Sequence, residues 1–144
     1  MKDEKNCLPK FYKCSTCGKI IEIIKDPETP TICCGHEMEL LIPNTTDGDH
    51  EKHVPVWDCK DNCVTVKIGA EPHPMEGSHH ICWIELVTNE KIIRKCSFPC
   101  GISTASFHLH KNEKILAVYA YCNIHGLWAD ICCNKEKKEG EMNV

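Results

Sequence analysis

The sequence has few aromatic residues, no long apolar run and no block of basic residues. Phe, Trp and Tyr make up 6% of the 144 residues, so large core side chains are in short supply. No apolar stretch approaches the roughly 18 residues that a membrane-spanning helix needs. Asp and Glu (21) outnumber Lys and Arg (17), and a net charge of −4 disfavours nonspecific binding to nucleic acid. We therefore expect neither a membrane nor a nucleic-acid partner, and about one ordinary domain by length.

A secretory signal is also missing, while cysteine and histidine are abundant. Residues 1–6 are mostly charged and no apolar segment follows them, so we expect a cytoplasmic protein with reduced thiols. The 13 cysteines are odd in number and cluster as Cys-x-x-Cys and Cys-Cys, and 9 histidines accompany them. This pattern favours metal binding over a disulfide scaffold.

The chain divides near residue 44, into residues 1–43, residues 44–133 and a charged tail of residues 134–144. In the first part, the run Lys19–Lys25 predicts a strand, which two prolines in residues 26–30 end. So few apolar side chains cannot hold a fold by burial alone, and a metal or a partner surface has to add stability. Residues 44–49 are polar and form the connector.

From Val54 onward the pattern is that of β-structure. Apolar and polar residues alternate over residues 64–68 and 107–110, and residues 81–88 and 115–121 are nearly continuous apolar runs. Short strands separated by Gly, Pro and Asn predict an antiparallel sandwich or barrel of about seven strands. The fold class is therefore all-β, with a small domain stabilised by metal that precedes the sandwich in the sequence.

The first candidate site is a set of four thiols at Cys14, Cys17, Cys33 and Cys34. A Cys-x-x-Cys turn directs two thiolates to one point, and a second pair completes a tetrahedral sulfur set for zinc or a mononuclear iron. Neighbouring side chains diverge, so Cys33 and Cys34 can share a metal only if the backbone bends. A zinc knuckle without redox function remains an alternative.

The second candidate site is spread along the chain where strands meet loops. Its pieces are several imidazoles and one thiolate: His53, His73, His79, His80, Cys122 and His125. Imidazole with thiolate suits iron, copper or zinc, and more than four such ligands exceed a closed tetrahedral zinc site.

The order of these motifs resembles desulfoferrodoxin, the two-iron form of superoxide reductase. The matching segments span residues from about 10 to 130: Phe11–Gly18, Cys33–Gly35, Glu51–Pro55, Pro72–Met75, His79 and Tyr121–Trp128. The resemblance implies a desulforedoxin-like domain followed by an immunoglobulin-like β-sandwich, with two irons per chain.

The resemblance also implies the ligands. It assigns the first iron to Cys14, Cys17, Cys33 and Cys34, and the second to His53, His73, His79 and His125 with Cys122 as axial ligand. His79 is preferred to His80 because the family places this ligand six residues after the Pro-His-Pro histidine, and a one-residue shift turns the side chain to the other face.

Four imidazoles and a thiolate leave one position open, as catalysis requires. The resemblance implies one-electron reduction of superoxide to hydrogen peroxide there, with a rubredoxin as electron donor and a homodimer as the assembly. Glu51 would occupy the open position in the ferric state, and Lys52 would attract the anion. The alternative for this pair is a solvated charged loop.

Two other functions stay open on the sequence: an interaction module stabilised by zinc, and a pure electron carrier.

The remaining cysteines depart from the family pattern. Two pairs have Cys-x-x-x-Cys spacing, Cys59 with Cys63 and Cys96 with Cys100. Three alternatives stay open for them: a third metal site, disulfides or free thiols. We expect Cys132 and Cys133 to be exposed thiols. The remaining histidines are read as surface or strand-face residues: His36, His50, His108 and His110.

Overall fold

A computed structural model describes residues 8–45, 53–69, 78–96 and 104–132. Every strand pair in these ranges is antiparallel. The strands are β1 (Lys10–Lys13), β2 (Ile20–Ile23), β3 (Ile32–Cys33), β4 (His36–Glu37), β5 (Glu39–Leu40), β6 (Pro55–Lys60), β7 (Cys63–Ile68), β8 (Ile81–Thr88), β9 (Ile92–Lys95), β10 (Thr104–His108), β11 (Ile115–Cys122) and β12 (Gly126–Ile131).

Seven of these strands form a two-sheet sandwich. A three-stranded sheet of order β10-β7-β6 faces a four-stranded sheet of order β12-β11-β8-β9. The alternating residues Val64, Val66 and Ile68 point into the space between the sheets, where they meet Ile84 and Leu86 of β8. The predicted all-β sandwich is confirmed, because period-2 alternation buries one face of β7 and leaves the other to solvent.

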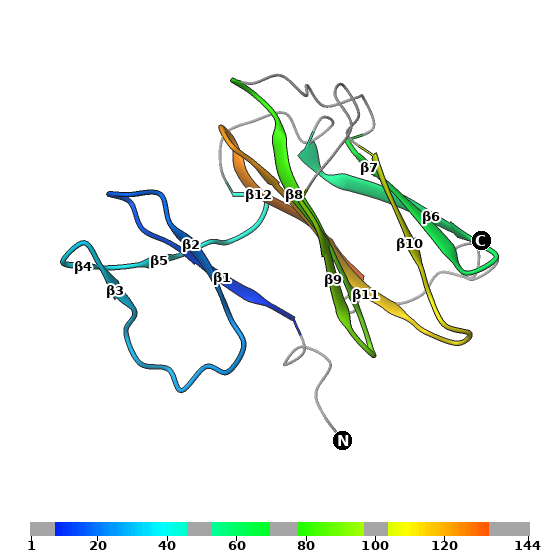
Figure 1. Cartoon of the computed structure of the whole chain (residues 1–144), viewed down its shortest axis with the longest axis horizontal. Helices are drawn as coiled ribbons and strands as arrows, with labels where there is room; N and C mark the ends of the chain where they lie inside the picture. The colour runs from blue at the N-terminus through cyan, green and yellow to red at the C-terminus, as the bar shows by residue number, and fades with distance from the viewer. Residues whose placement is uncertain (1–7, 46–52, 70–77, 97–103, 133–144) are drawn as a thin grey trace.

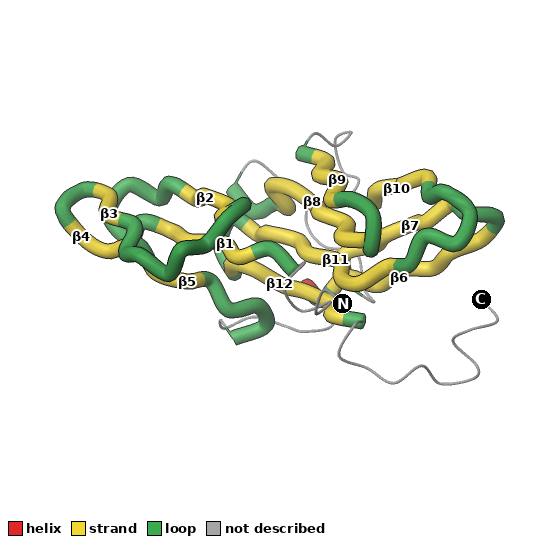
Figure 2. Tube along the Cα trace, turned by 90° about the horizontal axis from the view of Figure 1, so that it is seen from below, coloured by secondary structure: helices red, strands yellow, loops and turns green. Residues whose placement is uncertain are grey.

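A third layer covers the outer face of the four-stranded sheet. The N-terminal sheet, of order β2-β1-β5, packs there through Phe11, which is buried against Val87 and Tyr119. Figures 1 and 2 show the three layers. The middle layer contains β8 and β11. The N-terminal sheet of β1, β2 and β5 lies on one side of it, and the sheet of β6, β7 and β10 lies on the other.

This layering explains the two continuous apolar runs. Nearly all of β8 and β11 is buried, because even-numbered residues such as Val118 and Ala120 face β7 while Tyr119 and Tyr121 face the N-terminal sheet. A strand covered on both faces has no polar face to alternate with. The partner surface that the short N-terminal segment requires is therefore the sandwich itself.

The connector is attached to the sandwich at its beginning. The Asn44 side chain donates to the carbonyl of Ala129 at 2.9 Å and accepts from its N–H at 2.9 Å, and the Asn44 backbone N–H donates to Leu127. These bonds hold the chain along β12 where the N-terminal sheet ends.

Within the described ranges we find no helical segment with the length and apolarity that a membrane crossing requires.

Candidate metal centres

The first half of the thiol site is a turn between β1 and β2. The Gly18 N–H donates to the carbonyl of Cys14 at 2.9 Å, and the Cys17 N–H donates to the Cys14 sulfur at 3.5 Å. The turn closes with Gly18 at φ 79°, in the left-handed region that glycine adopts at no steric cost. It brings the sulfurs of Cys14 and Cys17 to the same side of the chain.

The second half is a tight hairpin between β3 and β4. Cys33 pairs with His36, so the turn residues are Cys34 and Gly35, at φ 53° and 77°. Two successive positive φ angles are typical of a type I′ turn. This turn is the backbone bend that the adjacent cysteines require, and it leaves the Cys33 and Cys34 sulfurs 3.9 Å apart.

The four sulfurs form one cluster, with every pair within 4.8 Å. The Cys17 and Cys33 sulfurs are 3.8 Å apart. The backbone N–H of Cys17 lowers the pKa of Cys14 to about 6, whereas hydrogen bonds with the thiols of Cys17 and Cys14 raise the pKa of Cys34 to about 12. Four thiols this close resist joint ionisation until a cation offsets the charge, so the cluster fits a thiolate-bound metal.

The second cluster lies at one end of the sandwich. The side chains of His53, His79, Cys122 and His125 place their ligand atoms within 4.8 Å of one another. Figure 1 shows why: the start of β6, the start of β8 and the β11–β12 turn gather at the same end. The side chains of His53 and Cys122 are 2% and 0% exposed, so two ligands of this cluster are buried. In the thiol cluster, by contrast, Cys17 and Cys34 are exposed to water.

The three rings of this cluster are arranged around a common point. His125 stands edge-on to both His53 and His79, with ring centroids 4.6 and 5.0 Å apart, and His53 and His79 are 6.2 Å apart. The fully buried Trp128 stacks on His53 at 4.9 Å and donates its indole N–H to the carbonyl of His125 at 3.1 Å. Three imidazoles and one thiolate fit a transition metal such as iron.

A three-residue connection places Cys122 and His125. Cys122 pairs with Gly126 across the β11–β12 hairpin, and Gly126 has φ 83°, a left-handed angle that returns the chain into β12. The Cys122 sulfur and the His125 Nδ1 are 3.8 Å apart, so this turn alone forms a two-atom chelate.

The remaining predicted site residues divide into two groups. His80 is outside the cluster, so the structure brings His79 rather than its neighbour to the other ligands. Glu51, Lys52 and His73 lie outside the described residues, as does His50. The histidines at 36, 108 and 110 are exposed, as expected of surface positions.

Outside the two clusters, four described cysteines are free thiols: Cys59, Cys63, Cys82 and Cys96. Cys59 pairs with Val64 and Cys63 with Lys60, so the two sulfurs point to opposite faces of their sheet and do not form one ligand pair. Cys96 is exposed, but Cys132 is partly buried, so the expectation of an exposed thiol is wrong there. Cys100 and Cys133 lie outside the described residues.

Cys82 has no counterpart in the sequence interpretation. It is partly buried beneath the N-terminal sheet, and desolvation together with the nearby Cys122 raises its pKa. It stands alone in the sequence, outside any Cys-x-x-Cys spacing, which is why no motif drew attention to it.

A further group of possible ligands, Glu90, His110 and Glu113, joins the turns at the other end of β8. Its central carboxylate is already engaged: Glu113 accepts from the Lys91 ammonium at 3.0 Å, from the His110 N–H at 2.8 Å and from the Thr88 hydroxyl. A lysine in the same group repels a cation, so this group braces two turns.

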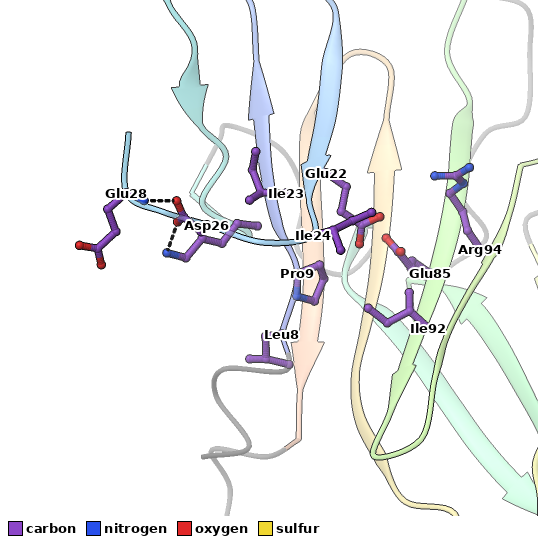
Figure 3. A pocket seen from close by; sticks show the side chains of 11 residues that line it. Leu8, Pro9, Glu22, Ile23, Ile24, Asp26, Glu28, Glu85, Ile92 and Arg94 are labelled. Carbon is purple, nitrogen blue, oxygen red and sulfur yellow. Dashed lines mark hydrogen bonds and ion pairs between the residues drawn. The ribbon is translucent and has the colours of Figure 1, made fainter. Parts of the chain in front are cut away.

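A cavity of about 760 Å³ lies between the N-terminal sheet and the sandwich. Figure 3 shows Glu22 of β2 and Glu85 of β8 facing each other across it, with Arg94 of β9 beyond Glu85. Burial, then the hydrogen bond with Glu22, raises the pKa of Glu85 to about 8. Glu85 therefore keeps its proton at neutral pH.

Comparisons with known proteins match both parts of the chain. The sequence model of desulfoferrodoxin matches residues 45–131, and that of the desulfoferrodoxin N-terminal domain matches residues 9–41. A desulfoferrodoxin from Syntrophotalea carbinolica is 43% identical over 120 residues, covering 83% of this chain and 94% of that protein. A desulfoferrodoxin homolog from Methanothermobacter thermautotrophicus is 40% identical over 119 residues, covering 83% and 95%. The crystal structure of the superoxide reductase from Treponema pallidum superposes with a TM-score of 0.70 at 27% identity, covering 85% of this chain and 98% of that one.

Proposed function

The chain belongs to the desulfoferrodoxin family, and from this membership we propose that it is a superoxide reductase. The reaction is the one-electron reduction of superoxide, which with two protons gives hydrogen peroxide and releases no oxygen. An external donor then returns the electron. In the cell, such a reaction removes superoxide.

The observation that carries the proposal is the convergence of His53, His79, His125 and Cys122 at a sheltered end of the sandwich. Iron bound by these residues would supply the single electron, with the thiolate raising its electron density as in thiolate-ligated haem. The buried Trp128 holds the His53 ring by stacking and fixes the His125 backbone by its indole N–H. These contacts fix the orientation of two of the proposed ligand residues.

We assign the ligands as the family pattern implies. The thiol cluster of Cys14, Cys17, Cys33 and Cys34 would hold one iron, and Cys122 would be a ligand of the other. His73 completes a set of four imidazoles with His53, His79 and His125. Five ligands leave one position for a small anion. The thiol cluster has no such position, so its part is electron transfer or support.

Glu51 and Lys52 complete the proposed catalytic site. Both directly precede His53 in the sequence, which supports a place beside the open position. Lys52 carries a positive charge that attracts superoxide and orients a proton donor. Glu51 is a carboxylate that would take the open position in the ferric protein and leave on reduction.

The electron donor and the assembly are proposed on the same family grounds, with a rubredoxin as donor and a homodimer as assembly. The cytoplasm is the proposed compartment, because the clustered cysteines suit a reducing environment. Large apolar side chains such as Ile24, 99% exposed, and Ile32, 63% exposed, support an assembly that covers part of the N-terminal domain.

The test combines metal content with a superoxide assay that also follows oxygen. We expect close to two irons per chain in protein purified without added metal, and consumption of superoxide without oxygen release. Stoichiometric zinc in a colourless protein would instead mean a structural module. Two irons with no superoxide consumption would mean an electron carrier.

A further inference from the structure

Two of the proposed ligand segments come from distant parts of the chain, and the sheet alone does not fix their relative position. His79 precedes β8, whereas Cys122 and His125 flank the β11–β12 turn. The β8–β11 ladder ends at the pair Ile81 and Cys122. His79 therefore lies two residues beyond the last residue pair of this ladder.

Asn123 links the two segments beyond the end of the ladder. Its backbone N–H donates to the carbonyl of His80 at 3.1 Å. Its side-chain Oδ1 accepts from the N–H of His80 at 2.7 Å, and its Nδ2 donates to the carbonyl of Ser78 at 3.1 Å. The side-chain amide thus acts as an additional peptide group that holds the chain on both sides of His79.

We propose that Asn123 is a positioning residue that sets the His79 imidazole against Cys122 and His125. It adjoins Cys122 in the sequence, so a shift of the His79 backbone relative to the thiolate strains its bonds to Ser78 and His80. Only a side chain with both a donor and an acceptor at this length makes both contacts. The inference deepens the proposed function and rests on the ligand assignment for that site.

The chain contains a matched control in Asn89. The Asn89 backbone N–H donates to the carbonyl of Lys114 at 3.0 Å, and its Oδ1 accepts from the Lys114 N–H at 2.8 Å. Asn89 directly follows the last residue of β8, whereas Asn123 bonds to Ser78 and His80, which precede the first residue of β8. The same substitution at these two positions therefore removes similar bonds at opposite ends of one strand.

The experiment measures Co²⁺ binding to the full chain by chelator competition, with thiolate-to-metal absorption as the readout. In Asn123→Ala we expect the affinity of the His/Cys site to fall about 10–100-fold, the usual effect of losing an outer-shell partner. Asn123→Asp keeps the acceptor but loses the donor, so its affinity should lie between those of Ala and Asn. The spectrum of the bound metal should shift in the same order, while the thiol site and Asn89→Ala stay unchanged.

The outcomes separate this inference from the proposed function. Equal affinity and an identical spectrum in unmodified protein, Asn123→Ala and Asn123→Asp would overturn the role of Asn123. An equal loss in Asn89→Ala would also overturn it, since the effect would then be general destabilisation. Unmodified protein that binds Co²⁺ only at the thiol site would contradict the ligand assignment itself. Thermal unfolding of each metal-free variant checks that the fold is retained.

Discussion

The thiol cluster and the His/Cys cluster are built in opposite ways. The thiol cluster comes from two tight turns within about twenty residues of sequence, and three of its four cysteines are at least partly exposed. The His/Cys cluster draws on three separate chain segments, and the sandwich, a buried tryptophan and Asn123 hold its members. A local site depends on turn geometry, whereas a distributed site depends on the whole fold.

The largest expected difference between the two sites is in activity. Outer-shell partners of a metal are typically worth about 10–100-fold, so we expect loss of the Cys122 ligand in Cys122→Ser to lower superoxide reduction by more than about 100-fold. In Cys14→Ser, disruption of the thiol site should leave superoxide reduction in place. Rate measurements with superoxide on both variants, with iron quantified per chain, test this. Complete loss of turnover in Cys14→Ser with the second iron retained would make the thiol site obligatory.

The next effect concerns how strongly the two regions depend on each other. Phe11 is 3% exposed and lies 5.0 Å from Trp83 and 5.6 Å from Tyr119, ring centroid to centroid. Truncating a buried Phe typically costs about 3–5 kcal/mol, so Phe11→Ala should lower the free energy of unfolding by that amount. Urea unfolding followed by tryptophan fluorescence measures it. Tyr12→Ala, on the other face of β1, is the control, and an equal loss there would mean that the interface contributes little.

A smaller effect is expected on the encounter with superoxide. If Lys52 attracts the anion, Lys52→Ala should slow the second-order reaction about 10-fold at low salt. Added salt should slow the unmodified protein more than the variant, because the charge that salt screens is gone. The measurement is the rate against ionic strength, with Lys60→Ala at the far end of β6 as control. Identical salt dependence of the rate in all three proteins would mean that Lys52 does not attract superoxide and belongs to a solvated charged loop.

The last expected effect is a pH dependence at the boundary between the regions. Glu85 has its pKa raised from 4.5 to about 8 by burial and by Glu22, so the folded chain binds a proton that the unfolded chain releases. The native protein therefore loses stability as pH rises from about 4.5 to about 8, by at most about 1.4 kcal/mol per pH unit for one proton. Glu85→Gln should match the native protein near pH 4.5 and exceed it at pH 8–9. Thermal unfolding against pH tests this, and a parallel curve for Glu85→Gln would contradict it; Glu39→Gln is the exposed control.

The sequence predicted the local features well. The Cys14–Cys17 turn and the strand over residues 20–23 follow from spacing and β-propensity, and both are present. The need for a backbone bend at Cys33 and Cys34 is also predicted, and the turn through Cys34 and Gly35 provides it. Such features are encoded within a few residues, where turn chemistry and alternation act directly.

The features that remained unseen depend on pairs distant in sequence. The apolar runs of β8 and β11 predicted buried strands, but apolar character does not say which surface covers each face. Glu85 stands within an apolar run and gave no sign of a carboxyl partner on β2. The bonds from Asn123 to Ser78 and His80 join residues 45 and 43 positions apart, which no periodicity reveals.

The position of β11 has a consequence for hydrogen exchange. This strand pairs with β12 on one side and β8 on the other, and both of its faces are covered by packed layers. Its amides exchange only when the sandwich opens as a whole, since no local fluctuation exposes them. The amides of β3 and β4, in a separate two-stranded hairpin, exchange through small local openings. Among the described strands we therefore expect β11 to exchange most slowly, which makes it a reference for timing motion at the thiol site residue by residue.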